Sequence, residues 1–259
     1  MIETVLRRDR ALVVASLIGV TVLAWLYLAK LTLDMAAGDM SLVGMSHMTA
    51  MDSTPWDGTT FALLYEMWLV MMIGMMVPSA TPMILLYAVV KRKAAEKGHP
   101  VASANVFAAG YVVVWATFAA IAAALQWGLH EAALLSPTMT STSPMLGGAL
   151  LLAAGAYQLT PLKLVCLRHC RSPMYFLSRH WRKGTRGAFA MGLEHGLYCV
   201  GCCWVLMTLL FVGGVMNLLW IAAIMVVVLL EKGAPYGHVL GHITGGALLV
   251  AGALLVAEA

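Results

Sequence analysis

Residues 191–203 read Met-Gly-Leu-Glu-His-Gly-Leu-Tyr-Cys-Val-Gly-Cys-Cys and lie within an apolar run over roughly 187–213. A helix that spans a bilayer needs about 20 such residues. At about 100° per residue, one face of this helix carries four donor side chains within about an 80° arc: Met191, His195, Cys199 and Cys202. Polar and ionisable groups are costly inside a membrane and usually mark function there. The stretch therefore predicts a transmembrane helix that carries a functional site.

The whole chain has the composition of a polytopic membrane protein. Of its 259 residues, 61% are hydrophobic and 11% are charged, whereas soluble domains carry about 25% charged residues. Runs of about 20 apolar residues predict about seven spans, at 11–33, 60–90, 103–129, 145–165, 187–213, 216–234 and 237–257. We therefore expect an all-α bundle that forms a single transmembrane domain over 1–259. Pro78 and Pro82 predict a kink in the second span.

Basic residues are distributed unequally between the two sides of the predicted bundle. Of the 16 Lys and Arg residues, only Lys30 lies on the side of the predicted outer loop over 34–59. The positive-inside rule places the N-terminus in the cytoplasm and the C-terminus outside. Because the basic residues are sorted by membrane side, no nucleic-acid partner is expected, and the lipid bilayer is the expected surrounding.

Four groups of side chains are candidate metal ligands. The helix over 187–213 contributes Met191, Glu194, His195, Cys199, Cys202 and Cys203. The span over 60–90 contributes Glu66, Met67, Met71, Met72, Met75 and Met76. The cytoplasmic end of the fourth span contributes Cys166, His169 and Cys170. The Met-rich outer loop over 34–59 contributes Met45, His47, Met48 and Met51.

These donors predict copper, as Cu(I), to be the bound metal, with zinc as an alternative and haem ranked below both. Residues four apart share a helix face, so His195 and Cys199 can contact one ion. Each group also has an ordinary structural interpretation, because Cys is a small buried residue and Met fills irregular gaps in helix packing. A single Cys favours that interpretation, but three within 199–203 favour a site.

Two other classes of function stay open at this stage. One is a membrane thiol-redox protein in which Cys199, Cys202 and Cys203 exchange electrons with a quinone or thiol partner, because Cys199-Val-Gly-Cys202 has the spacing of redox dithiols. A non-catalytic subunit of a membrane complex is the other class, with haem held by His195, His238 and His242. The sequence has no nucleotide loop, serine nucleophile elbow or H-E-x-x-H motif. We predict no catalytic residues, and binding is favoured over enzymatic activity.

Four motifs resemble a bacterial family of unknown function, described as predicted metal-binding integral membrane proteins. They are YQLTPLKLVCLRHCRSP at Tyr157–Pro173, GLEHGLYCVGCCW at Gly192–Trp204, GGVMNLLW at Gly213–Trp220 and MWLVMMIGMMVP at Met67–Pro78. The resemblance runs from about 60 to 235. It implies a location in the bacterial inner membrane and metal binding, and it does not specify a reaction.

The sequence as a whole favours a membrane protein that binds copper and acts in metal transport, delivery or cofactor assembly. Such a protein needs a partner, and a copper chaperone or another membrane subunit is expected. In this hypothesis metal meets the outer methionines and is held by the second and fifth spans. Cys166, His169 and Cys170 then exchange it with the cytoplasm. The sequence indicates neither a direction of transfer nor an oligomeric state.

The predicted topology gives a first test. Reporter fusions at the C-terminus should be active only when the reporter works outside the cytoplasm, because an odd number of spans places the two termini on opposite sides. A fusion at the N-terminus provides the control. A cytoplasmic C-terminus would contradict the seven-span topology.

Overall fold

The computed structural model describes residues 2–37, 58–96, 102–132, 134 and 143–258, and these residues contain helices and connections but no strand. The helices are α1 (Ile2–Ala37), α3 (Gly58–Glu96), α4 (Ala104–Glu131), α5 (Pro144–Gln158), α6 (Pro161–Arg171), α7 (Pro173–His180), α8 (Gly184–Thr208), α9 (Leu210–Gly213), α10 (Leu218–Gly233) and α11 (Gly237–Ala257). The predicted all-α fold is confirmed. The outer-loop candidates Met45, His47, Met48 and Met51 lie outside the described residues.

Within the described residues, five helices are long and apolar enough to cross a membrane, or up to six if the bent pair α5 and α6 forms one span. The five are Val13–Asp34, Gly58–Arg92, Ala104–Glu131, Gly184–Gly213 and Gly237–Ala257. The predicted span over 216–234 corresponds to α10, which has 16 residues, fewer than the ~20 that a span requires. A tight connection joins α9 to α10, and Gly214 adopts a φ of 95° there.

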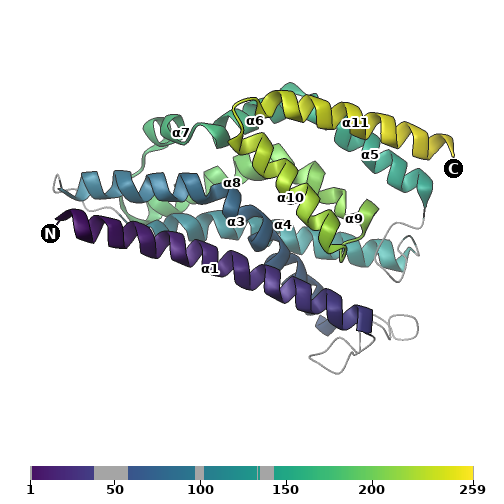
Figure 1. The fold of residues 1–259 in the computed structure, drawn as a ribbon, viewed down its shortest axis with the longest axis horizontal. Helices are drawn as coiled ribbons and strands as arrows, with labels where there is room; N and C mark the ends of the chain where they lie inside the picture. The colour runs from purple at the N-terminus through teal and green to yellow at the C-terminus, as the bar shows by residue number, and fades with distance from the viewer. Residues whose placement is uncertain (1, 38–57, 97–101, 133, 135–142, 259) are drawn as a thin grey trace.

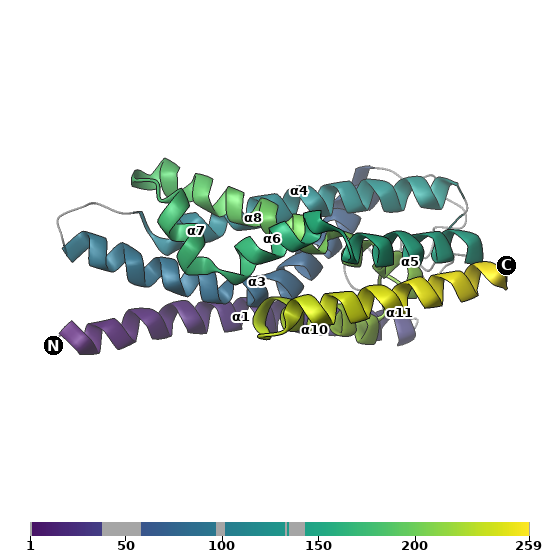
Figure 2. The same cartoon turned by 90° about the horizontal axis from the view of Figure 1, so that it is seen from above.

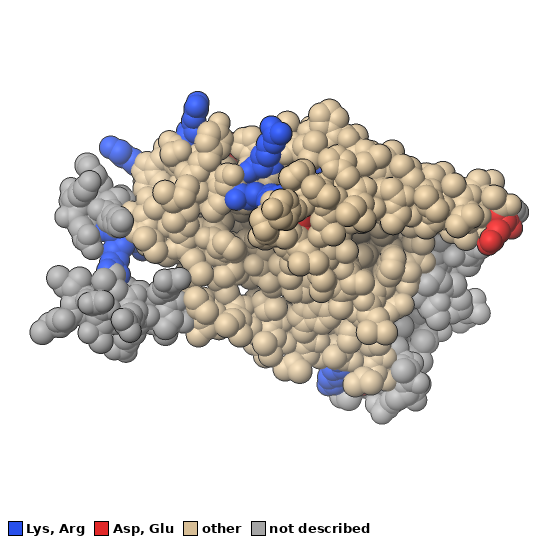
Figure 3. Space-filling view, turned by 45° about the horizontal axis from the view of Figure 1, so that its top comes forward, with Lys and Arg blue, Asp and Glu red and all other residues tan. Residues whose placement is uncertain are grey.

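The ends of the bundle differ in charge. Figures 1 and 2 show α1 beginning and α11 ending at opposite ends of the long axis. On the face shown in Figure 3, most Lys and Arg side chains lie in the half that contains the start of α1. This arrangement agrees with termini on opposite sides of a membrane. The sidedness itself stays a prediction.

The predicted helix over 145–165 is broken in the structure, which corrects the expectation of one continuous span. The axes of α5 and α6 differ by 65°. Thr160 caps α6, because its side-chain oxygen accepts a hydrogen bond from the Lys163 amide at 3.3 Å. Pro161 follows at the first helical position, which suits proline. The Thr-Pro pair therefore starts a new helix.

The long helix α3 continues through Pro78 and Pro82 and bends along its length, as predicted (Figure 1). Pro78 has no N–H group to donate to the Gly74 carbonyl one turn earlier. The Trp25 indole N–H of α1 donates to that carbonyl at 3.3 Å. A side chain of the neighbouring helix thus satisfies the acceptor that proline leaves open, as membrane helices require.

Glycines bring two pairs of helices into backbone contact. A Cβ atom at Gly192 of α8 would collide with the Phe107 carbonyl oxygen of α4, and one at Gly110 would collide with the Phe189 carbonyl oxygen. The second pair is α5 and α11, which lie side by side in Figures 1 and 2. A Cβ at Gly155 of α5 would lie 2.8 Å from the backbone oxygen of α11 at position 245. Small residues at membrane helix contacts allow this close approach.

A buried ion pair joins α6 to α10. Lys163 Nζ lies 2.6 Å from Glu231 Oε2, and the two side chains are 1% and 2% exposed. Gln158 Nε2 donates to the other carboxylate oxygen at 3.0 Å. Nearby, Arg171 Nη2 donates to the Ala234 carbonyl at 2.5 Å. These contacts hold α6 against the end of α10 and the start of α11.

The contact between α4 and α8 predicts a large effect from a single methyl group. Gly192→Ala should lower the free energy of unfolding by about 1–3 kcal/mol, the usual cost of overpacking. Thermal unfolding in detergent measures the change. Gly128→Ala is the matched control, since nothing lies within 4 Å of a Cβ there and alanine favours helix by up to about 1 kcal/mol. Equal unfolding temperatures for the two variants would contradict the close contact.

Candidate metal centre

The donor face of α8 points into the bundle. Met191, His195, Cys199, Cys202 and Cys203 are all buried, with side chains at most 3% exposed. The thiols of Cys202 and Cys203 donate to the Cys199 carbonyl one turn earlier, at 3.1 and 2.9 Å. These local bonds fix the direction in which the two sulfurs leave the helix. The helical periodicity therefore leads to a cluster of sulfur atoms inside the protein.

Two pairs of sulfur atoms from different helices meet at this cluster. Cys203 Sγ lies 3.9 Å from Met76 Sδ of α3, and Cys202 Sγ lies 3.9 Å from Cys170 Sγ of α6. At metal–sulfur bonds of about 2.3 Å, two sulfurs that share a metal lie about 3.8 Å apart in tetrahedral geometry and about 4.6 Å apart in linear geometry. Both pairs have a separation that one metal ion can bridge.

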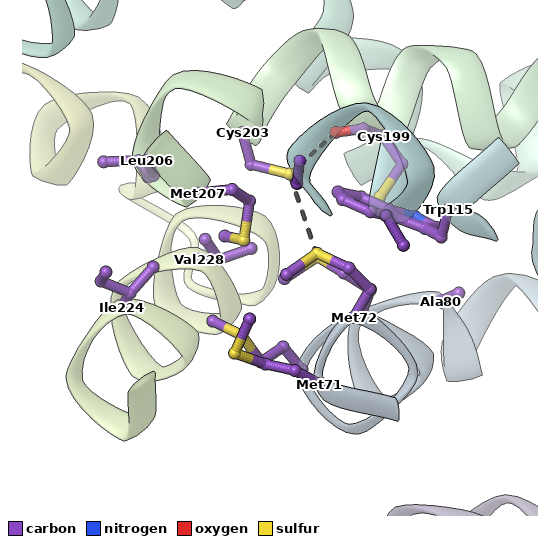
Figure 4. Close-up of a cluster of buried hydrophobic side chains, with 14 of the residues drawn as sticks. Met71, Met72, Ala80, Trp115, Cys199, Cys203, Leu206, Met207, Ile224 and Val228 are labelled. Atoms are coloured by element: carbon purple, nitrogen blue, oxygen red, sulfur yellow. Dashed lines mark hydrogen bonds between the residues drawn. The ribbon is translucent and has the colours of Figure 1, made fainter. Parts of the chain in front are cut away.

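The methionines of α3 continue the group of sulfur atoms away from the thiols. The five are buried, none more than 2% exposed: Met67, Met71, Met72, Met75 and Met76. Figure 4 shows Met71 and Met72 facing Cys203 and Met207 of α8, with Val228 and Ile224 of α10 beside them. Soft thioethers of α3 thus lie next to the soft thiols of α8.

Cys199 has polar partners from two other helices. Lys232 Nζ of α10 donates to the Cys199 sulfur at 2.9 Å and to Ser79 Oγ at 3.1 Å. The Tyr111 hydroxyl of α4 lies 3.1 Å from the same sulfur and donates to the Met76 carbonyl at 2.9 Å. The ammonium group of Lys232 favours negative charge on the Cys199 sulfur, and the thiolate is the form of cysteine that binds metal. The Tyr111 hydroxyl gives its proton to the Met76 carbonyl, so toward the sulfur it is an acceptor.

His195 occupies an aromatic cage next to Cys199. Its ring centroid lies 5.4 Å from that of Phe176, 5.8 Å from Tyr111 and 6.1 Å from Phe107. The ring is 3% exposed, and its Nδ1 atom has no hydrogen-bond partner. A buried polar atom without a partner is costly and calls for an explanation. A bound ligand would supply the missing partner.

Several predicted donors lie away from the sulfur cluster. Glu66 is exposed on α3. Cys166 is half-buried and packs close to Gly201 of α8. His169 stacks on the Tyr198 ring with a centroid distance of 4.3 Å. Glu194 forms ion pairs with His180 and Arg182 outside the cluster.

The described residues contain no group of three or more His, Cys, Asp or Glu side chains arranged as a metal site. The thioether of Met76 and the orphan nitrogen of His195 enlarge the donor set beyond that arrangement. Sulfur pairs at bridging distance, with an imidazole one turn away, fit the chemistry of a soft ion. The residues present therefore fit Cu(I) as a bound cargo.

Sequence reasoning missed Tyr111, Ser79 and Lys232, which lie on three different helices. Lys232 resembles an ordinary basic residue at the end of a span, and Tyr111 an ordinary aromatic residue within one. The one available signal is the position of Lys232 directly after Glu231 in a strongly apolar helix. Two adjacent charges there require buried partners.

None of the curated proteins and none of the solved structures matches the chain. A family model described as PpoB2, copper chaperone, matches residues 65–255. This match confirms the resemblance to a bacterial metal-related family, which the motifs place over about 60–235. Since the match covers well over half of the 259 residues, the chain belongs to the PpoB2 copper-chaperone family.

Proposed function

We propose that this protein binds Cu(I) inside the membrane through sulfur atoms of α3, α6 and α8 and passes the ion to a partner protein. The observation that carries this proposal is the meeting of Cys203 with Met76 and of Cys202 with Cys170, each at 3.9 Å. Sulfur donors of this kind select Cu(I) over harder ions. Copper is the cargo here, and the role is transport, delivery or cofactor assembly.

The methionines of α3 are proposed to lead the ion toward the thiols. Met67, Met71 and Met75 follow one another at intervals of one helical turn, and all are buried. Weak thioether ligands at such intervals let an ion move stepwise, because no single site holds it tightly. The ordinary alternative is that these methionines only fill space. Replacement by leucine, which has a similar volume, separates the two interpretations.

The thiols of α6 are proposed to form the other end of the route. Cys170 is half-buried and pairs with the buried Cys202, so it connects the interior to the end of the bundle that contains α7. Cys166 lies one turn earlier on α6. If the predicted orientation holds, this end faces the cytoplasm, and the protein lies in the bacterial inner membrane.

A thiol-redox role is the second candidate, and one distance favours it. Cys170 and Cys202 come from different helices with their sulfurs 3.9 Å apart, so a small approach would allow a disulfide. A quinone partner that takes up the two electrons and two protons of the thiols would form this bond, and oxidation would then be coupled to the position of α6 against α8. In that case, loss of either thiol abolishes activity while the metal content stays unchanged.

The copper proposal predicts a change in metal content. Protein purified in mild detergent without chelator should contain about one equivalent of copper by elemental analysis. The double variant Cys202→Ser/Cys203→Ser should lose it, because it removes the α8 thiol from each of the two sulfur pairs. Zinc in place of copper would favour a structural site. No metal after anaerobic Cu(I) loading would contradict the proposal and favour thiol redox chemistry.

The proposed thioether ligand predicts a selective loss of affinity. Met76→Leu should raise the Kd for Cu(I) about tenfold, equivalent to ~1.4 kcal/mol, while the unfolding temperature changes little. Competition with a Cu(I) chelator measures the Kd. Met145→Leu is the matched control, because Met145 is 56% exposed on α5. Equal Kd values for the two variants would show that Met76 only fills space.

A further inference from the structure

A second group of metal-binding side chains lies outside the sulfur cluster. His169 of α6, His180 of α7 and Glu194 of α8 come together near the end of the bundle that contains α7. His180 Nε2 lies 3.2 Å from Glu194 Oε1, and the two side chains are 22% and 24% exposed. The His169 and His180 ring centroids are 6.4 Å apart. The short helices α6 and α7 thus present two imidazoles next to one carboxylate from the middle of α8.

The backbone orients both imidazoles. His180 Nδ1 lies 3.1 Å from the Phe176 carbonyl, and His169 Nδ1 lies 2.9 Å from the Val165 carbonyl. A carbonyl oxygen can only accept, so Nδ1 donates in each pair. This leaves Nε2 of each ring as the atom that could bind a metal. At His180 that nitrogen faces Glu194 Oε1, which also only accepts, so an ion bound between them would take the place of the Nε2 proton. Histidines that bind metals are commonly held in this way, with the second nitrogen bonded to a backbone carbonyl or a carboxylate.

We propose that His180 and Glu194, joined by His169, form a metal site separate from the sulfur cluster. Two imidazoles and a carboxylate suit a divalent ion of borderline hardness, such as Zn(II), and not the soft Cu(I) ion. The site does not depend on copper binding at the thiols. Its position at a partly exposed surface would let an ion enter without crossing the bundle.

The resting arrangement explains why these residues do not already stand as a three-ligand site. Arg182 Nη2 lies 3.1 Å from Glu194 Oε2, and the Arg182 side chain is 52% exposed. His169 stacks in parallel on Tyr198. Metal binding at His180 and Glu194 requires Arg182 to turn into solvent and His169 to turn toward His180. Arg182 is exposed, so its ion pair with Glu194 is weak and easily opened. His169 is half-buried and gives up its stack on Tyr198 when it turns.

One aromatic residue separates this site from the sulfur cluster. Phe176 is fully buried, with its ring 4.8 Å from that of His180 and 5.4 Å from that of His195. An ion bound at His180 would therefore hold α7 in place over the buried imidazole. The proposed zinc site would therefore stabilise the position of α7 next to His195.

The test measures Zn(II) binding to the full chain in detergent by isothermal titration calorimetry. Glu194→Gln and His180→Phe should each weaken one equivalent of bound Zn(II) by at least about tenfold. Arg182→Ala should tighten the same equivalent, because it frees the second carboxylate oxygen. A purely structural ion pair would not give this gain. His238→Phe is the control, since His238 is exposed on α11 and outside the site.

Zinc-edge X-ray absorption identifies the ligands of that equivalent. Nitrogen and oxygen neighbours at about 2.0–2.1 Å are expected, whereas sulfur at about 2.3 Å would overturn the proposal. Identical Zn(II) binding in all four variants would overturn it too. Cu(I) stoichiometry is measured in parallel on Glu194→Gln. If Glu194→Gln still binds Cu(I) but has lost Zn(II), the two sites are separate. If the unaltered protein binds Zn(II) but no Cu(I), only the proposed copper function is contradicted.

Discussion

The close packing of α4 against α8 is the constraint on which the candidate metal centre depends. At Gly110 and Gly192 each helix lies against the backbone of the other, with no side chain between them. Because Gly192 lies against Phe107, Tyr111, one turn after Phe107 in α4, comes within 3.1 Å of the sulfur of Cys199, two turns after Gly192 in α8. Larger residues at the glycines would separate the helices and remove the hydroxyl from the thiol. The contact between Tyr111 and Cys199 thus depends on the absence of side chains at Gly110 and Gly192.

Periodicity predicted the helices and the inward face of α8, because burial of one helix face is a local property of sequence. It did not predict which helices meet that face. Met76 and Cys170 reach the thiols through packing between distant segments, and His169 instead stacks on Tyr198. The break before α6 was predictable from Thr160 and Pro161, a capping residue followed by a helix-starting proline. Hydrophobicity alone conceals that break, since the two helices taken together are apolar enough to pass as one span.

Two lysines show the limit of charge counting in a membrane protein. Lys163 and Lys232 fit the positive-inside pattern of loops and helix ends, yet both ammonium groups bond to partners inside the protein. Lys163 meets Glu231 at 2.6 Å, and Lys232 meets Cys199 at 2.9 Å. An isolated charge in this environment is expensive, so each lysine specifies its partner. The charge pattern gives the side of the membrane and not the direction of a side chain.

Glu231 and Lys232 are neighbours in α10, so their side chains leave the helix about 100° apart. Glu231 reaches α6 and Lys232 reaches α8, while a thiol of α8 meets Cys170 of α6. Each of the three helices α6, α8 and α10 therefore contacts the other two through polar or sulfur side chains. A rotation of one helix would alter its contacts with both of the others. The sulfur of Cys199 and the ion pair of α6 are therefore connected through two adjacent residues of α10.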